Sequence, residues 1–360
     1  MLGMAKARLL APWTGVEDRS AIYHVVSRVV GREFLLGRAE KEQFVKYMRL
    51  YEAFCGVRVL TYCIMSNHFH ILLEVPPASE RELSDAALLE KLEGLYSSQH
   101  VDLVREQLAV LSRSRTPEGR EAYQNLRESY TSRMWDMGLF MKTLKQRFTS
   151  WYNKKHGRRG TLWEARYKSV LVENGLAART MAAYIDLNPV RAGMVKDPKD
   201  YRWCGYGEAI AGNTLARNGL LRVISELESD LSNDGWSGAR DITRYDWRSV
   251  AGRYRLILFD DGVESSGELS GHKRRGFTSE AVEREEKRSG QLSVAEIARC
   301  KTRYFIDGAV LGSQQFVEDV VTSLKGSYLP ANRKGSGGRL GGRMKSSNLW
   351  SLRKLAENGV

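Results

Sequence analysis

Two histidines separated by a single residue are the first side chains in the sequence whose types and spacing could do chemistry. His68 and His70 lie in residues 65–75, which are apolar after a polar start and are followed by Pro76-Pro77. This composition predicts a strand that ends at the prolines. Because residues two apart in a strand point to the same face, the imidazoles would project side by side and could form half of a metal site. The alternative is two unrelated histidines, one exposed and one satisfied by a hydrogen bond.

A tyrosine and an asparagine four residues apart are the second such pair. Tyr184 and Asn188 lie in a segment with helical spacing, residues 176–188, and therefore share a helix face. Pro189 follows directly and marks a helix end, so Asn188 could also be only a cap or turn residue. A tyrosine hydroxyl, with a pKa of about 10, is a poor nucleophile at neutral pH and needs help, which a metal ion can supply.

A basic segment punctuated by glycines, residues 156–168, lies between these two pairs. Its cationic side chains could neutralise phosphates, and Trp163 or Tyr167 could stack on a base, although both aromatic residues could equally be core residues. We expect binding rather than simple solvation for the basic cluster. The candidate nucleic-acid contacts in and after this segment are Arg158, Arg159, Trp163, Arg166, Lys168 and Arg191.

Several other residues are weaker candidates for the same chemistry. Tyr152 lies on a predicted amphipathic helix and is a rival nucleophile, but it lacks a matching ligand four residues on. His24 and His156 are expected to be structural or to face DNA rather than to bind a metal. Glu74 shares the face of the two histidines by parity, at the far end of their strand, and could support a ligand.

The elements that must position these residues follow from their periodicity. The predicted order is a strand over 21–30, a helix over 39–54, a strand over 57–64, the histidine strand, a helix over 135–155, a strand over 169–173 and a helix over 176–188. Residues 78–134 are charged with leucines at helical spacing, which predicts a helical insertion. Without it the order is β-α-β-β-α-β, the ferredoxin-like pattern of an α+β fold, with one antiparallel sheet and helices on one face.

In type and order, these residues resemble the IS200-like single-tyrosine (Y1, HUH-type) transposases, and most of all the REP-associated tyrosine transposases. The resemblance covers roughly residues 20–207 and rests on His68-Phe69-His70, the basic loop and the run from Tyr184 to Gly193. It implies Tyr184 as the nucleophile and one divalent metal ion, Mg²⁺ or Mn²⁺, bound by His68, His70 and Asn188. The sequence departs from the insertion-sequence members, which have Gln where Asn188 stands.

The resemblance also implies an activity. Such a protein cleaves and rejoins single-stranded DNA, for example a REP-like hairpin end, by transesterification: the tyrosine forms a 5′-phosphotyrosine link and releases a 3′-OH. The tyrosine could act in its own chain or in a partner, so a monomer and a homodimer both stay open. Two alternatives are a domesticated, non-catalytic DNA-binding protein and a metal-dependent single-strand nuclease in which water attacks instead of Tyr184.

Composition narrows the function classes. The 360 residues carry a net charge of +13, which favours a polyanionic partner such as nucleic acid. Four cysteines without CxxC spacing argue against a zinc ribbon or a disulfide framework and fit a reducing cytoplasm. Neither a transmembrane run nor a signal peptide is expected. With the resemblance, which implies a bacterial protein associated with the nucleoid, we expect a cytoplasmic location.

The predicted domain organisation has four parts. An N-terminal arm spans residues 1–19, the catalytic domain spans 20–210 with its insertion at about 78–134, an irregular linker spans 211–290, and a C-terminal DNA-binding module spans 291–360. Within the linker, residues 245–258 could hold a short helix and a strand, and the charged run 283–288 is expected to be exposed. The module could contain a helix-turn-helix-like pair and a basic tail that becomes ordered on DNA or stays disordered.

Overall fold

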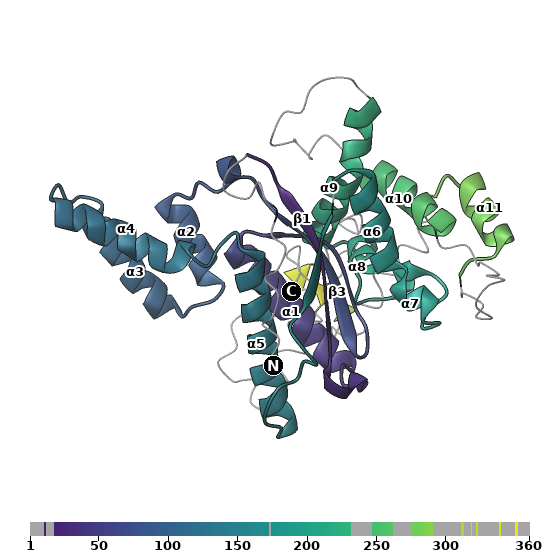
Figure 1. Ribbon diagram of the computed structural model, residues 1–360, viewed down its shortest axis with the longest axis horizontal. Helices are drawn as coiled ribbons and strands as arrows, with labels where there is room; N and C mark the ends of the chain where they lie inside the picture. Colours follow the sequence, from purple (N-terminus) through teal and green to yellow (C-terminus); the bar gives the residue numbers. More distant parts are fainter. Residues whose placement is uncertain are drawn as a thin grey trace, which may run out of the picture. The chain divides into compact units, whose positions relative to one another are not determined.

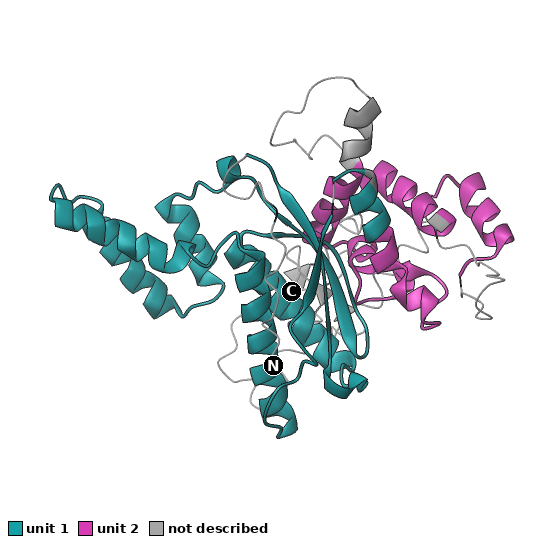
Figure 2. Cartoon of the chain, in the orientation of Figure 1, with its two compact units in different colours: residues 1–181, 235–240 teal, residues 182–234, 241–360 magenta. Residues whose placement is uncertain are grey.

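The computed structural model describes residues 11, 18–172, 174–231, 247–261 and 276–290, and the short pieces 311–312, 318, 322, 338–339 and 350–351. The chain divides into two compact units, residues 1–181 with 235–240 and residues 182–234 with 241–360 (Figure 2). The boundary falls inside one helix, α6 (Leu176–Asp186). Most of the predicted N-terminal arm and of the predicted C-terminal module lies outside the described residues.

A four-stranded antiparallel sheet forms the centre of the first unit (Figure 1). Its strands are β1 (Ala21–Arg28), β2 (Arg58–Ile64), β3 (His68–Val75) and β4 (Lys168–Val172), and they lie in the order β2-β3-β1-β4. Each neighbouring pair runs antiparallel. This is the ferredoxin-like arrangement, so the α+β fold predicted from the sequence is confirmed.

Two helices, α1 (Arg38–Cys55) and α5 (Met137–His156), pack together against one face of this sheet (Figure 1). The ring of Phe69 lies 4.7 Å from that of Phe44 on α1, and Phe44 in turn lies 5.1 Å from Phe148 on α5. All three rings are fully buried. Each such side chain contributes about 1.5–3 kcal/mol through burial, so the helices fix which face of β3 turns inward.

The position of Phe69 decides where its neighbours point. Phe69 stands between His68 and His70, and alternate residues of a strand face opposite ways, so both histidines lie on the face that α1 and α5 do not cover. A slip of one residue in the pairing of β3 would bury the histidines under the helices and expose Phe69. The apolar core therefore holds the register that brings the two imidazoles together.

Helix ends in this unit have identifiable causes. Gly56 ends α1 in a left-handed conformation (φ 68°), and its N–H donates to the Glu52 carbonyl at 3.1 Å. Asp136 begins α5 by accepting a hydrogen bond from the Leu139 N–H at 2.7 Å. These caps fix where α1 ends and where α5 begins, and so fix the lengths of the two helices that pack on the sheet.

The predicted helical insertion is present between β3 and α5. After a short 3₁₀ turn (Ala78–Glu80), it consists of α2 (Asp85–Glu93), α3 (Ser98–Leu111) and α4 (Pro117–Thr131). A hydroxyl begins each helix, because the side chains of Ser84, Ser97 and Thr116 accept backbone N–H bonds. Within the first unit these helices extend away from the sheet as an arm (Figure 1).

The second unit is mostly helical. It contains the end of α6, then α7 (Asn188–Arg191), a 3₁₀ turn (Pro198–Asp200), α8 (Gly205–Ala211), α9 (Thr214–Leu231), α10 (Trp247–Asp261) and α11 (Ser279–Lys287). Three two-residue strands, β5 (Leu311–Gly312), β6 (Gly338–Arg339) and β7 (Trp350–Ser351), pair in the order β5-β7-β6.

The expectation of an irregular linker over residues 211–290 is wrong. Instead of an irregular linker, most of the described residues in this range belong to α9, α10 and α11. Residues 245–258 were expected to hold a short helix and a strand. From Trp247 onward this range is helical and belongs to α10, because Val250, Tyr254 and Leu258 recur every four residues and are all buried. Glycine, serine and charge dominate the local composition here, and they mask this apolar stripe.

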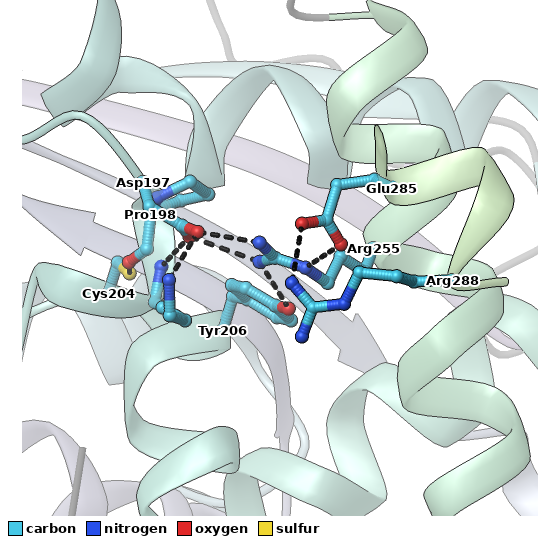
Figure 3. Close-up of polar contacts among 8 residues, drawn as sticks. Asp197, Pro198, Cys204, Tyr206, Arg255, Glu285 and Arg288 are labelled. Atoms are coloured by element: carbon cyan, nitrogen blue, oxygen red, sulfur yellow. Dashed lines mark hydrogen bonds and ion pairs between the residues drawn. The ribbon is translucent and has the colours of Figure 1, made fainter. Parts of the chain in front are cut away.

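A buried arginine ties α10 to its neighbours (Figure 3). Arg255 is only 2% exposed; its Nη2 donates to Asp197 at 2.7 Å and its Nε donates to Glu285 at 2.8 Å. The Arg255 Nη1 also donates to the Tyr206 hydroxyl at 3.4 Å. Glu285 is therefore a buried ion-pair partner, and the expectation that residues 283–288 form exposed linker is wrong at this position.

Three cysteines, Cys55, Cys63 and Cys204, are buried thiols that are not joined in disulfides. Reduced cysteines were expected from their spacing in the sequence. Among the helices that the structure describes, none has both the length and the apolar character needed to cross a membrane.

Candidate active site

His68 and His70 lie side by side on β3, as their spacing predicts. Their ring centroids are 5.1 Å apart and the ring planes are inclined by 82°. On the neighbouring strand, Arg28 stands opposite His68 and Val26 opposite His70. The pair thus lies at the start of β3, beside the last residues of β1.

A neighbouring amide orients the first imidazole. The Nδ1 atom of His68 lies 2.6 Å from Oδ1 of Asn67, and the Nδ2 of Asn67 donates to the Arg32 carbonyl at 3.0 Å. Because the amide oxygen can only accept, Nδ1 of His68 carries the proton. The lone pair then sits on Nε2, the nitrogen that could bind a metal ion.

A third histidine meets the second imidazole. Nε2 of His24, on β1, lies 2.9 Å from Nδ1 of His70, and the two rings stack with planes 9° apart. His24 stands two residues before Val26 on β1, so it emerges on the same face as His70 at a diagonal position. The same parity argument that paired His68 with His70 would have found His24 once the strand register was known.

Burial keeps these imidazoles neutral. It lowers the pKa of His24 and of His68 to about 4, with a smaller contribution from the Arg28 charge in the case of His68. Burial also lowers the pKa of His70 to about 3, assisted by the neighbouring His68, His24 and Arg28. All three rings are therefore in the neutral form that metal binding requires.

The nucleophile candidate and the amide candidate lie on the second unit. Tyr184 is 43% exposed, near the end of α6. Nδ2 of Asn188 donates to the carbonyls of Tyr184 and Ile185 at 3.0 and 3.2 Å, so Asn188 does act as a helix cap. These bonds commit the amide nitrogen and turn Oδ1 the other way, which makes the oxygen the atom that could serve as a ligand.

A cation accompanies Tyr184. The guanidinium of Arg191 lies 5.1 Å from the Tyr184 ring centroid, and its Nη1 donates to the Tyr184 carbonyl at 3.3 Å. Tyr184, Asn188 and Arg191 thus follow one another at helical spacing on one face. This arrangement places a positive charge beside the hydroxyl-bearing ring.

An aspartate that sequence reasoning missed anchors the same helix end. Asp186 is fully buried; its Oδ1 accepts from the Tyr206 N–H at 3.1 Å and its Oδ2 accepts from the Tyr254 hydroxyl at 2.7 Å. It lies between Tyr184 and Asn188 in the sequence. Its position on the opposite side of the helix was the available signal, but Tyr254, one of its partners, lies in the range that was expected to be linker.

The predicted ligands are thus distributed over both units, with His68 and His70 in the first and Asn188 in the second. Within the described residues, no group of three or more His, Cys, Asp or Glu side chains is arranged to hold a metal ion. The two imidazoles fit a divalent ion, since both are neutral and each is oriented by a hydrogen bond at Nδ1.

The basic loop is attached to the same end of the sheet. Val30 N–H donates to the Leu162 carbonyl at 2.9 Å, and Glu164 N–H donates to the Arg28 carbonyl at 2.9 Å. Lys168 begins β4 opposite Val26, on the face that carries His70. Exposed cations of this region are Arg28, Arg159, Arg166 and Lys168, whereas Arg158 is half-buried over the Tyr152 ring.

The aromatic residues of the loop are core residues, which corrects the expected DNA contact of Trp163. The indole of Trp163 is 7% exposed, its Nε1 donates to Thr149 at 2.9 Å, and its ring packs 5.4 Å from Phe69. Tyr167 is buried as well. Neither ring can offer a face to a base without leaving the core, so the loop presents charge rather than stacking surfaces.

The weaker candidates have structural contacts. Tyr152 is 4% exposed and so cannot reach a substrate as a nucleophile. His156 stacks on Tyr152 and lies 3.1 Å from Glu40, in keeping with a structural role. Glu74 is buried and forms an ion pair with Arg58 at 3.2 Å, at the opposite end of β3 from His68.

Residues 18–97 match the family model of the IS200-like transposases. The match includes His68 and His70 and ends before the segment that carries Tyr184, and over this stretch it confirms the resemblance seen in the sequence. Among solved structures, the chain is similar to a REP-associated tyrosine transposase bound to a REP hairpin, with 12% identity over 58% of this chain and 87% of that one and a TM-score of 0.36. That likeness is too distant to bear on activity. No curated protein matches the chain.

Proposed function

We propose that this protein is a single-tyrosine transposase that cleaves and rejoins single-stranded DNA by metal-assisted transesterification, with Tyr184 as the nucleophile. Its substrate is a strand that contains a hairpin of the REP type, and it acts on bacterial DNA in the cytoplasm. The family match of residues 18–97 supports the assignment to transposases. The observation that carries the chemistry is the pair of neutral imidazoles, His68 and His70, side by side on β3 with each Nδ1 at hydrogen-bond distance from a neighbouring side chain.

The metal site of this proposal joins His68 and His70 with the amide oxygen of Asn188. When bound, a divalent ion would polarise the scissile phosphate and offset the negative charge that develops on it. A neutral set of two imidazoles and one amide suits Mn²⁺ better than Mg²⁺, because Mg²⁺ prefers oxygen ligands. Asn67 and the core around Phe69 keep the imidazoles in place, and the cap bonds of Asn188 engage its amide nitrogen, so the oxygen is the ligand atom of this side chain.

Tyr184 supplies the new bond in the proposed reaction. Its hydroxyl oxygen attacks the phosphorus, the bond from phosphorus to the 3′-oxygen breaks, and the departing strand leaves as a 3′-OH after taking up a proton. The product is a 5′-phosphotyrosine link. In the reverse sense, a 3′-OH attacks the same phosphorus and releases Tyr184, so strands are rejoined without a nucleotide cofactor. The positive charge of Arg191 beside the ring favours both an approaching phosphate and the developing charge.

Cations near the histidine pair form the proposed DNA-binding surface. Arg28 stands opposite His68, and Lys168 lies on the same face as His70, two strands away across β1. Arg159 and Arg166 add exposed charge from the basic loop. These side chains would neutralise the phosphates on either side of the scissile bond and would hold the strand without reading its bases.

A denaturing gel with a labelled hairpin oligonucleotide and Mn²⁺ tests the proposal. Wild type is expected to give a labelled band at the size of the protein, because the tyrosine stays linked to DNA. Tyr184→Phe is expected to give neither this band nor cleavage. Tyr152→Phe, which alters a buried tyrosine of the first unit, serves as the matched control and is expected to behave as wild type.

The other outcomes separate the alternatives. Cleavage without a covalent band would indicate a nuclease in which water attacks. Binding of several hairpins without any cleavage would indicate a DNA-binding protein that has lost the reaction. Full cleavage by Tyr184→Phe would overturn the assignment of the nucleophile.

A further inference from the structure

The hydrogen bond between His24 and His70 connects a residue that the proposed reaction does not use with one that it does. We propose that His24 is a positioning residue: its Nε2 accepts a hydrogen bond from Nδ1–H of His70 and holds the His70 ring with Nε2 turned toward the metal ion. This inference rests on the proposed function, because it concerns one ligand of the proposed metal centre.

The contact has the geometry of a hydrogen bond between two imidazoles. The nitrogen atoms are 2.9 Å apart, which is typical for a nitrogen donor, and both rings are more than nine-tenths buried. With the ring planes 9° apart and the centroids 5.2 Å apart, rotation of either ring would break both the bond and the stacking. Since one nitrogen of His70 is engaged in this way, only its other nitrogen can face an ion.

The sheet provides a rigid support for this contact. Strands β1 and β3 pair in unbroken register from Ala21 opposite Val75 to Arg28 opposite His68. His24 therefore sits at a fixed diagonal from His70, and the distance between them does not depend on a loop. Residues that orient a metal ligand perform best when they are held by regular structure.

The two ligands are supported in different ways, which gives the inference a specific consequence. His68 is oriented by its sequence neighbour Asn67, whose amide is itself fixed by the Arg32 carbonyl. His70 instead depends on a residue from another strand. Loss of His24 should therefore loosen one ligand and leave the other in place, so metal binding should weaken rather than disappear.

Metal affinity of the full-length protein tests this role without reference to DNA cleavage. We would titrate Mn²⁺ into wild type, His24→Phe and His24→Gln, and follow free Mn²⁺ by electron paramagnetic resonance. His24→Phe keeps an aromatic ring that can stack but has no nitrogen, and it should bind Mn²⁺ about 10- to 100-fold more weakly. His24→Gln offers an amide oxygen as an acceptor and should recover most of the affinity.

A matched control replaces another hydrogen-bonded histidine. His100 on α3 lies 2.9 Å from the Tyr130 hydroxyl within the helical insertion, so His100→Phe makes the same change away from the histidine pair. It should leave Mn²⁺ affinity unchanged. If His24→Phe keeps the affinity of a wild type that binds Mn²⁺, this inference is overturned and the proposed function stands. A wild type that binds no Mn²⁺ would overturn the metal centre and this inference together.

A second measurement is independent of any variant and of the metal. In ¹⁵N-histidine-labelled wild type without metal, the nitrogen shifts of His70 should report a proton on Nδ1, as a donor to His24 requires. A proton on Nε2 of His70 would contradict the inference, even if His24→Phe failed to fold. In a folded His24→Phe protein, the same signals should indicate a mixture of the two tautomers.

Discussion

The hydroxyl of Tyr254 donates a 2.7 Å hydrogen bond to Oδ2 of Asp186, across 68 residues of sequence. Asp186 lies two residues after Tyr184, so α10 holds the very end of the helix that presents the candidate nucleophile. The Tyr206 N–H binds the other oxygen of the same carboxylate. A segment that reads as linker in the sequence is therefore part of the support of the tyrosine.

Removing the hydroxyl of Tyr254 should destabilise the second unit. Burial and the Asp186 charge raise the pKa of Tyr254 well above its usual value, so the phenol stays protonated and remains a donor. In Tyr254→Phe the buried carboxylate loses this donor, and we expect the free energy of unfolding to fall by about 1–3 kcal/mol. Urea denaturation followed by circular dichroism measures the change. Tyr184→Phe, which alters an exposed ring, should change stability by less than about 0.5 kcal/mol.

Neutralising Arg255 should have a larger effect than removing any surface charge. Arg255→Met leaves Asp197 and Glu285 buried without their shared cation, and breaking a buried ion pair in this way costs about 3–5 kcal/mol. Arg253→Met, on an exposed side of the same helix, is the matched control and should cost less than about 0.5 kcal/mol. Equal losses of unfolding free energy in the two variants would contradict the role assigned to the buried network.

Asp197 should make the protein sensitive to acid. Burial would raise the pKa of this carboxyl, but hydrogen bonds and ion pairs with Arg255 and Lys199 outweigh burial and hold the pKa below the usual aspartate value. The unfolded chain therefore takes up the proton at a higher pH than the folded one. The resulting stabilisation is complete above about pH 4, the unfolded pKa, and is lost as the pH falls through the folded pKa.

Comparison with Asp197→Asn isolates this effect, because the amide has no proton to take up in this range. Between about pH 4 and pH 2, the unfolding free energy of wild type should fall more steeply than that of the variant. Urea denaturation at a series of pH values provides the two slopes. Parallel slopes would show that Asp197 does not have the depressed pKa.

The basic cluster should control binding through charge alone. Arg166→Gln and Lys168→Gln each remove one exposed cation, so each should reduce the slope of log K against log salt by up to about 0.7 on single-stranded DNA. The loss should be similar for hairpins of unrelated sequence, since phosphate contacts read no bases. Fluorescence anisotropy at several salt concentrations measures both quantities. Arg120→Gln, an exposed change in the insertion, should leave the slope as in wild type.

The four-stranded sheet and its two helices could be predicted because their signals are local. Each signal lies within a few residues of the element that it predicts. Alternation around Phe69 predicts the histidine strand, the glycine at position 56 predicts the end of the first helix, and the prolines after Val75 predict the end of the histidine strand. The order of the elements then limits the topology to the ferredoxin-like sheet. The side-by-side placement of His68 and His70 follows from strand geometry alone.

What the sequence could not provide depends on partners far along the chain. The contact of His24 with His70 requires the register of two strands that are separated by a helix and a third strand. Arg255 looks like one more surface cation until Asp197 and Glu285 are known to surround it. Trp163 lies in a run of basic residues that is typical of a nucleic-acid contact, and only its packing on Phe69 identifies it as core.

The helical insertion lengthens the stretch of chain that must close before the sheet is complete. Val26 on β1 pairs with Lys168 on β4, and α2, α3 and α4 lie within the intervening loop. Loop-closure entropy grows only with the logarithm of length, and each doubling costs about 0.6 kcal/mol. The insertion makes up less than half of the chain between these two residues, so this stretch is less than twice as long as it would be without the insertion. During synthesis, β4 is the last strand of this sheet to emerge, and it can therefore join the sheet almost as readily with the helical insertion as without it. The insertion is accordingly free to vary in length and sequence without unfolding the domain that bears it.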